Sequence, residues 1–124
     1  MARRIHRVLI VDDDSDVVNA ASMLMSLWGY ESIAVLDASC AEATALRFHP
    51  DVILLDIAMP GFDGFEVARA IRSHAEFHRI KIIAISGYDH ESNRLKAKAC
   101  GIDRYFAKPI IPADLRRELR RSSH

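Results

Sequence analysis

Five short apolar runs, separated by segments with helical spacing, constrain the fold of this 124-residue chain more than any other feature. The runs lie at residues 7–11, 31–35, 51–55, 80–85 and 104–108, and three of them are almost continuously apolar. Continuous aliphatic runs of this length are typical of strands that are covered on both faces. We therefore predict five buried strands.

The segments between these runs repeat their apolar residues at helical intervals. In the first segment the repeat consists of Val17, Ala21, Leu24 and Trp28, and Gly29 follows where a helix would end. Four more helices are predicted: an alanine-rich one over 38–48, one marked by Phe65, Ala68 and Ile71, one marked by Leu95, Ala99 and Cys100, and one marked by Leu115 and Leu119 that begins near Pro112. Asp or Ser residues precede the first, second and fifth helices, where they would cap them.

Strands that alternate with helices form βαβ units, which build a parallel sheet with helices on both faces. Right-handed crossovers leave few arrangements of five such strands. We predict an α/β fold, the doubly wound (βα)5 flavodoxin-like arrangement with strand order 2-1-3-4-5. The pattern extends over residues 5–121 without a linker or repeat. We expect a single domain over 1–124, with no output domain in this chain.

Charge and composition argue against several classes of protein. Lys plus Arg and Asp plus Glu each number 17, so the formal net charge is zero and a broad nucleic-acid-binding surface is not expected. No apolar stretch approaches the roughly 18 residues of a membrane span, and no signal-peptide pattern is recognisable. Cys40 and Cys100 lie far apart and form no metal or redox motif. We expect a cytoplasmic protein.

Polar residues follow four of the five predicted strands. Asp12 and Asp13 follow the first strand, Asp56 the third, Ser86 the fourth, and Lys108 with Pro109 the fifth. In a doubly wound sheet these ends face the ligand crevice, and the first and third strands are neighbours. Converging carboxylates are costly unless a cation accompanies them, and hard oxygen ligands suit Mg²⁺. A metal, a lysine, a hydroxyl and a carboxylate nucleophile together suit phosphoryl transfer.

Four motifs in this order, "VDDD", "LDIAMPGFDG", "AISGY" and "YFAKP", resemble the receiver domain of two-component response regulators. The resemblance covers essentially residues 5 to 121. Ser86 stands where threonine is commoner in that family, although either hydroxyl can donate a hydrogen bond. Ala58, two residues after Asp56, contributes only a small methyl group. A phosphoryl group on Asp56 would therefore be more open to water or small donors.

The resemblance implies a role for each site residue. Asp56 would accept a phosphoryl group from a phosphohistidine, and Lys108 would pair with it before and after transfer. Asp13, Asp56 and the backbone carbonyl of Ala58 would bind Mg²⁺ (or Mn²⁺) directly, and Asp12 would act mainly through water. Ser86 and Tyr105 would form the conformational switch, and the Lys108–Pro109 bond would be cis.

The resemblance also implies the partners. A histidine kinase or phosphotransfer protein would supply the phosphoryl group. A downstream protein, or a second copy of the chain, would bind through the fourth helix, fifth strand and fifth helix. A run of arginines on the last helix, Arg116, Arg117, Arg120 and Arg121, is either a solvated face or a contact for an acidic partner. Enzymatic activity would be limited to self-phosphorylation and self-dephosphorylation.

Two alternatives remain at this point. The "VDDDSD" stretch also fits a phosphohydrolase of the haloacid dehalogenase type, with Asp12 as nucleophile and Asp14 as acid/base. That reading lacks the acidic metal-binding pair expected after the lysine, because Asp114 and Glu118 follow on a helix. Asp14 more simply caps the first helix. The other alternative is a docking module that works without phosphorylation, and the complete acidic set argues against it.

Overall fold

The computed structural model describes residues 5–59, 61–87 and 91–121. Pro60 and Tyr88 of the quoted motifs lie outside the described residues. The part of the chain that the structure describes contains five strands: β1 (Arg7–Val11), β2 (Glu31–Val35), β3 (Val52–Asp56), β4 (Lys81–Ser86) and β5 (Arg104–Ala107). Its α-helices are α1 (Ser15–Leu27), α2 (Ala41–Phe48), α3 (Gly64–Arg72), α4 (Glu91–Ala99) and α5 (Pro112–Arg120), with short 3₁₀ helices at Ala38–Cys40 and Ala75–Phe77.

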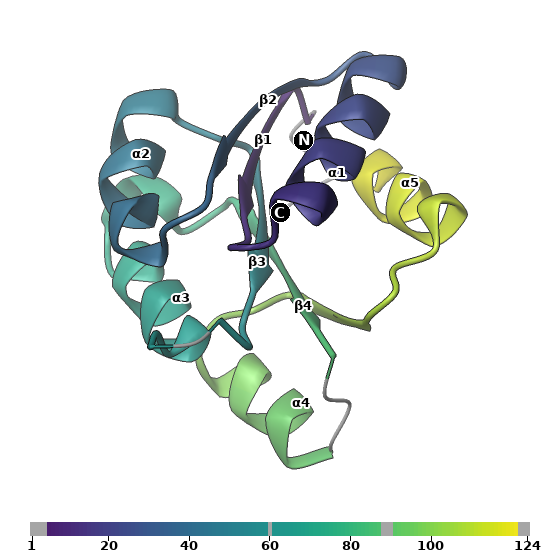
Figure 1. The fold of residues 1–124 in the computed structure, drawn as a ribbon. Helices are drawn as coiled ribbons and strands as arrows, with labels where there is room; N and C mark the ends of the chain where they lie inside the picture. The colour runs from purple at the N-terminus through teal and green to yellow at the C-terminus, as the bar shows by residue number, and fades with distance from the viewer. Residues whose placement is uncertain (1–4, 60, 88–90, 122–124) are drawn as a thin grey trace.

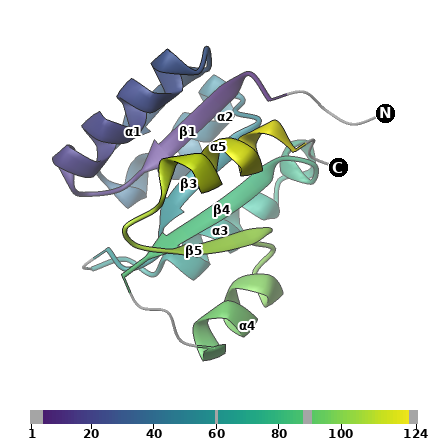
Figure 2. The same ribbon diagram turned by 90° about the vertical axis from the view of Figure 1, so that its right-hand side faces the viewer.

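The five strands form one parallel sheet in the order β2-β1-β3-β4-β5, which confirms the predicted topology. Helices α1 and α5 cover one face of this sheet, and α2, α3 and α4 lie on the other side (Figure 1). Figure 2 views the face that carries α1 and α5. The residues that the sequence predicts to be functional follow β1, β3, β4 and β5, so we call the edge where these strands end the functional edge.

Side chains alternate between two apolar cores because successive residues of a strand point to opposite faces. In β3, Ile53 and Leu55 pack with α2, α3 and α4, whereas Val52 and Leu54 pack with α1 and α5. Every residue of β3 and β4 is buried. This double coverage explains why the central strands are continuous apolar runs in the sequence.

The helix ends differ in part from the prediction. Asp14 caps α1 as expected, by accepting hydrogen bonds from the amides of Asp16 and Val17. Asp37 likewise caps the 3₁₀ turn that leads into α2. The prediction of an Asp or Ser cap for α5 is wrong, since Ile111 occupies that position and makes no capping hydrogen bond. Pro112 at the start of α5 has no amide hydrogen to satisfy, which reduces the need for a cap.

A buried ion pair fastens the end of α5 to the sheet. The Lys81 ammonium at the start of β4 donates to Glu118 Oε2 at 2.8 Å and to the carbonyl oxygens of Glu118 and Arg121. Arg104 Nε lies 3.1 Å from the other carboxylate oxygen of Glu118. These contacts lie at the opposite end of β4 from Ser86, away from the functional edge. Among the described residues, none of the helices has the length and apolar content needed to cross a bilayer.

Candidate functional site: an acidic cluster with one lysine

Three carboxylates meet where β1 and β3 end. Asp12 and Asp13 follow β1 directly, and Asp56 is the last residue of β3. The two strands are paired and parallel, so their ends lie side by side. One oxygen from each of the three carboxylates lies within 4.8 Å of the others. Asp12 and Asp56 are buried and Asp13 is exposed. The acidic residues singled out in the sequence therefore share one site that is open on the side of Asp13.

Backbone amides fix the orientation of the two buried carboxylates. Asp12 Oδ1 accepts a hydrogen bond from the amide of Asp14 at 3.0 Å. Asp56 Oδ1 accepts one from the amide of Ala58 at 2.8 Å. In each residue this leaves Oδ2 to interact with the cationic group described next. The amide of Ala58 thus has an observed contact in the site, while metal binding by its carbonyl stays a prediction.

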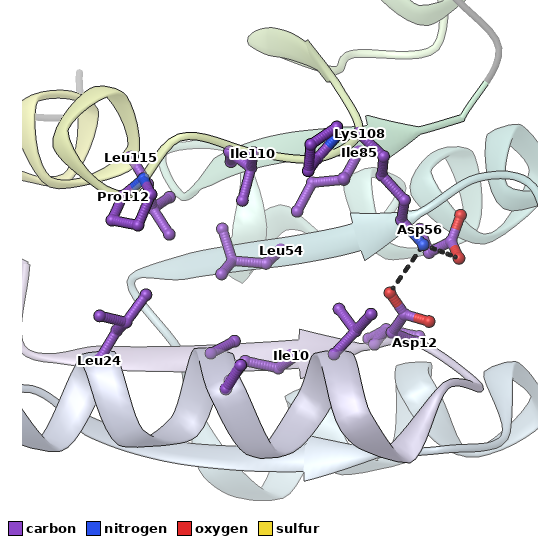
Figure 3. Close-up of a pocket in the computed structure, with 15 residues that line it drawn as sticks. Ile10, Asp12, Leu24, Leu54, Asp56, Ile85, Lys108, Ile110, Pro112 and Leu115 are labelled. Atoms are coloured by element: carbon purple, nitrogen blue, oxygen red, sulfur yellow. Dashed lines mark hydrogen bonds and ion pairs between the residues drawn. The ribbon is translucent and has the colours of Figure 1, made fainter.

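Lys108 places its ammonium between these two carboxylates (Figure 3). Its Nζ donates to Asp56 Oδ2 at 3.0 Å and to Asp12 Oδ2 at 3.2 Å. The residue follows β5, where its amide donates to the carbonyl of Ser86 at 2.7 Å. The Lys108–Pro109 peptide bond is cis. The end of the edge strand therefore supplies the positive charge that the acidic cluster requires.

The site shifts the pKa of two of its groups. Burial raises the pKa of the Asp12 carboxyl and the neighbouring Asp56 charge adds to this, against the opposing contributions of the Asp14 amide hydrogen bond and of Lys108. Burial acts to lower the pKa of the Lys108 ammonium, but its hydrogen bonds and charge interactions with Asp56 and Asp12 outweigh that effect and raise it. Lys108 is therefore held in its charged form by the cluster.

Close packing fixes the loop that follows Asp56. Gly64 begins α3, and a Cβ atom placed on it would lie 2.4 Å from the Cα of Ile57. Only glycine allows such a close backbone approach. Asp63 caps α3 by accepting from the amide of Phe65 at 2.9 Å, a cap that the sequence prediction missed. The start of α3 thus holds the segment that carries Ala58.

The two predicted switch residues lie on the adjacent strands β4 and β5. Ser86 ends β4 and is buried, and Tyr105 lies opposite Ala84 and is half-buried. Sequence reasoning missed Arg94 of α4, whose guanidinium lies 4.9 Å from the centre of the Tyr105 ring. A cation above an aromatic face is attracted to it, so Arg94 favours the observed position of Tyr105. Nothing in the sequence distinguishes Arg94 from other surface arginines, because its contact with Tyr105 depends on how α4 packs against β5.

The donor set fits a hard divalent cation. Three carboxylates offer oxygen ligands that lie within 4.8 Å of one another, and one side of the cluster is exposed. Mg²⁺ prefers oxygen ligands and is usually held by one or two carboxylates together with water and phosphate oxygens. Asp13, the exposed member, is the carboxylate most accessible to a hydrated ion. No thiol or imidazole belongs to this cluster of described residues, which suits Mg²⁺ or Mn²⁺ better than zinc.

Asp14 and Glu118 serve structural roles, which weakens the phosphohydrolase alternative. Asp14 is exposed, and one of its oxygens accepts the two hydrogen bonds that cap α1. Glu118 is buried against Lys81 at the far end of β4. Neither residue joins the cluster of Asp12, Asp13 and Asp56. The acid/base and the late metal ligand required by that reading are therefore engaged elsewhere.

Comparison with known proteins agrees with this geometry. The family model described as the response regulator receiver domain matches residues 8–120. The chain belongs to the response regulator receiver family. Such receivers are parts of two-component systems. Among curated relatives, the transcriptional regulatory protein PrrA of Mycobacterium tuberculosis is 36% identical over 109 residues, which are 88% of this chain and 46% of PrrA. The chain thus spans about half the length of the curated relatives that it matches.

Solved receivers have the same fold. The chemotaxis protein CheY4 of Vibrio cholerae is 29% identical with a TM-score of 0.87, over 93% of this receiver and 96% of CheY4. The receiver domain of the sensor histidine kinase PA1611 from Pseudomonas aeruginosa is 30% identical with a TM-score of 0.82, over 92% and 93% of the two chains. The PA1611 structure has a magnesium ion coordinated in its active-site cleft. These likenesses extend over nearly the whole receiver fold.

Proposed function

We propose that this receiver acts in the cytoplasm as a phosphoacceptor, and that Asp56 takes a phosphoryl group from a phosphohistidine on a histidine kinase or phosphotransfer protein. The observation that carries this proposal is the setting of Asp56. One of its oxygens accepts from the Ala58 amide, the other accepts from the Lys108 ammonium, and two further carboxylates lie within reach of a shared cation. An oriented carboxylate beside cationic groups is suited to attack phosphorus.

The chemistry follows from the positions of these groups. An Asp56 oxygen attacks the phosphorus while the bond from phosphorus to the donor imidazole nitrogen breaks, which forms an acyl phosphate and frees the imidazole. Lys108, which donates to the Asp56 carboxylate before transfer, can donate to the phosphoryl oxygens after transfer without leaving the site. Asp12, Asp13 and Asp56 would hold Mg²⁺, which when bound neutralises negative charge on the phosphoryl oxygens. Lys108 and the carboxylates thus supply the positioning that phosphoryl transfer depends on.

The response to phosphorylation would pass through Ser86 and Tyr105. Ser86 lies at the end of β4, next to the strand that ends in Asp56. A hydrogen bond from its hydroxyl to a phosphoryl oxygen is available in the phosphorylated state alone, so it biases the equilibrium between two packings. Tyr105 then moves inward, and its contact with Arg94 of α4 changes with it. This links the acceptor to the α4–β5 surface.

The α4–β5–α5 surface would bind the downstream partner. Arg94, Lys98 and Arg104 line a groove of about 750 Å³ between α4 and β5. Asp103 in the same groove is already paired with Arg72 at 3.0 Å. The positive charge of this groove favours an acidic protein segment over a second copy of the same basic surface. The output of the whole protein depends on that partner or on further domains.

A phosphorylation assay tests the acceptor directly. Wild type incubated with acetyl phosphate and Mg²⁺ should gain one phosphoryl group by intact mass, and hydroxylamine should remove it. Asp56→Asn should gain none, whereas Asp16→Asn should behave as wild type because Asp16 is exposed on α1 outside the cluster. A phosphoryl group retained by Asp56→Asn but lost from Asp12→Asn would contradict the proposal and favour the phosphohydrolase reading.

A further inference from the structure

An apolar cavity of about 450 Å³ lies between α1 and α5, directly beside the phosphoacceptor site (Figure 3). Its floor is formed by Ile10 of β1, Leu54 of β3 and Ile85 of β4, which project from the sheet on this face. The volume falls within the range of small-molecule sites, which are concave and mostly apolar with a few placed polar groups. The cavity therefore has the volume and the apolar lining that are typical of a ligand-binding site.

Small side chains on the helices keep this cavity open. On one side α1 contributes Val17, Ala20 and Ala21, and on the other Ile110 before α5 and Pro112 at its start line the cavity. The alanines are too short to fill the space above the sheet, and proline and isoleucine add no polar group to the lining.

The mouth of the cavity continues along α1 as exposed apolar surface. Ala20 and Leu24 line a second hollow together with Met23 and Leu27. Met23 is 73% exposed and Leu27 is 78% exposed, which is unusual for such large apolar side chains on one helix face. An apolar molecule therefore meets a continuous hydrophobic path from the surface of α1 into the cavity.

All charged groups of the lining lie at one end. Asp12, Asp56 and Lys108 carry two negative charges and one positive charge, and Asp13 adds an exposed negative charge beside them. An anionic headgroup placed there would face an excess of carboxylates, whereas a cationic headgroup would be attracted. The charge distribution thus favours a ligand whose headgroup is positively charged.

We propose that this cavity binds an apolar organic amine, with its hydrophobic body on Ile10, Leu54 and Ile85 and its cationic nitrogen attracted by the carboxylates of Asp12, Asp13 and Asp56, whose summed negative charge exceeds the single positive charge of Lys108. The amine and a divalent cation are attracted to the same carboxylates, so each weakens the binding of the other. The inference rests on the shape and charge of the cavity and does not depend on phosphoryl transfer to Asp56.

Three probes with one body and different headgroups test this proposal. Naphthylmethylamine, naphthylmethanol and naphthoate are titrated into metal-free receiver, with binding followed through backbone amide NMR shifts. We expect the amine to bind at least about tenfold more tightly than naphthoate. The shifts should centre on Leu24, Leu54 and Leu115, which surround the cavity. Mg²⁺ should weaken the binding of the amine and leave the binding of naphthylmethanol unaffected.

Variants that fill the cavity from opposite walls complete the test. Ala20→Phe and Pro112→Trp should each lower the affinity for the amine by at least about tenfold. Ala43→Phe, at an exposed position of α2 on the other side of the sheet, should not. Equal affinity for amine and carboxylate, or shifts away from the cavity, would overturn the proposal. So would a dimer of wild type, seen by sedimentation and abolished in Ala20→Phe, because a second copy would then occupy the groove.

Discussion

Lys108 Nζ lies 3.0 Å from Asp56 Oδ2, although 52 residues separate the two in the chain. The contact joins the end of the edge strand β5 to the end of the central strand β3. It also makes the charge of Lys108 a contribution to the stability of the fold at this edge.

Stability at alkaline pH should depend on Lys108. The folded site raises its pKa above the ordinary 10.5, so the charged lysine contributes stability that is complete below that pH and is lost as the pH rises through the folded pKa. In metal-free protein, the free energy of unfolding by urea should fall more steeply above pH 10.5 for wild type than for Lys108→Gln. Lys98→Gln, at an exposed position of α4, should keep the wild-type profile. Identical profiles for wild type and Lys108→Gln would contradict this.

Asp13 should control metal affinity without affecting folding. Because its carboxylate is exposed and belongs to the acidic cluster, Asp13→Asn removes a ligand and leaves the core intact. We expect Mg²⁺ affinity, measured by calorimetry, to fall by about tenfold or more while the free energy of unfolding without metal stays the same. Asp16→Asn provides the matched control, with unchanged affinity. A similar loss in both variants would point to a diffuse acidic surface.

Gly64 should not tolerate a side chain. An added Cβ would lie 2.4 Å from Ile57 Cα, so α3 or the loop after Asp56 must shift in Gly64→Ala. We expect a loss of about 1–3 kcal/mol in the free energy of unfolding, despite the better helix propensity of alanine. At Gly87 an added Cβ meets nothing within 4 Å, so Gly87→Ala should change stability little. Urea denaturation of the two variants gives the comparison, and equal stability would show that α3 shifts at no cost.

The buried pair of Lys81 and Glu118 should be strongly coupled. Lys81→Met leaves a buried carboxylate whose remaining charged partner, among the described residues, is Arg104, and we expect a loss of about 3 kcal/mol. Lys81→Met combined with Glu118→Leu removes both buried charges and should be less destabilising than the sum of the single changes. Additive losses in a double-mutant cycle would show that the two charges act independently.

The strands and the acidic cluster could be predicted because both depend on local sequence patterns and one topological rule. Strands buried on both faces are continuous apolar runs, and parallel strands bring their following residues to a single edge. Asp12, Asp56 and Lys108 could therefore be placed at one edge before any coordinates were known. Asp14 could be assigned to the helix cap for a similarly local reason.

Features that depend on the exact packing of helices could not be predicted. Of the residues that mark the fourth helix in the sequence, Cys100 is buried as expected but Leu95 is 65% exposed, and Ala97 faces the core instead. A helix with so few apolar residues has a weak periodicity, which does not define its buried face. Lys81 lies within the apolar run 80–85, and its pairing with Glu118 becomes apparent only when α5 lies over β4.

Helix α5 has a different constraint at each end. Its last turn is held by the Lys81 ammonium, and its first turn follows Lys108 after only Pro109, Ile110 and Ile111. The helix is nine residues long, which corresponds to a rise of about 13 Å. A displacement of Lys108 at the proposed phosphoacceptor site would therefore move the first turn of α5 while the Lys81–Glu118 pair holds its last turn, so that the whole helix tilts.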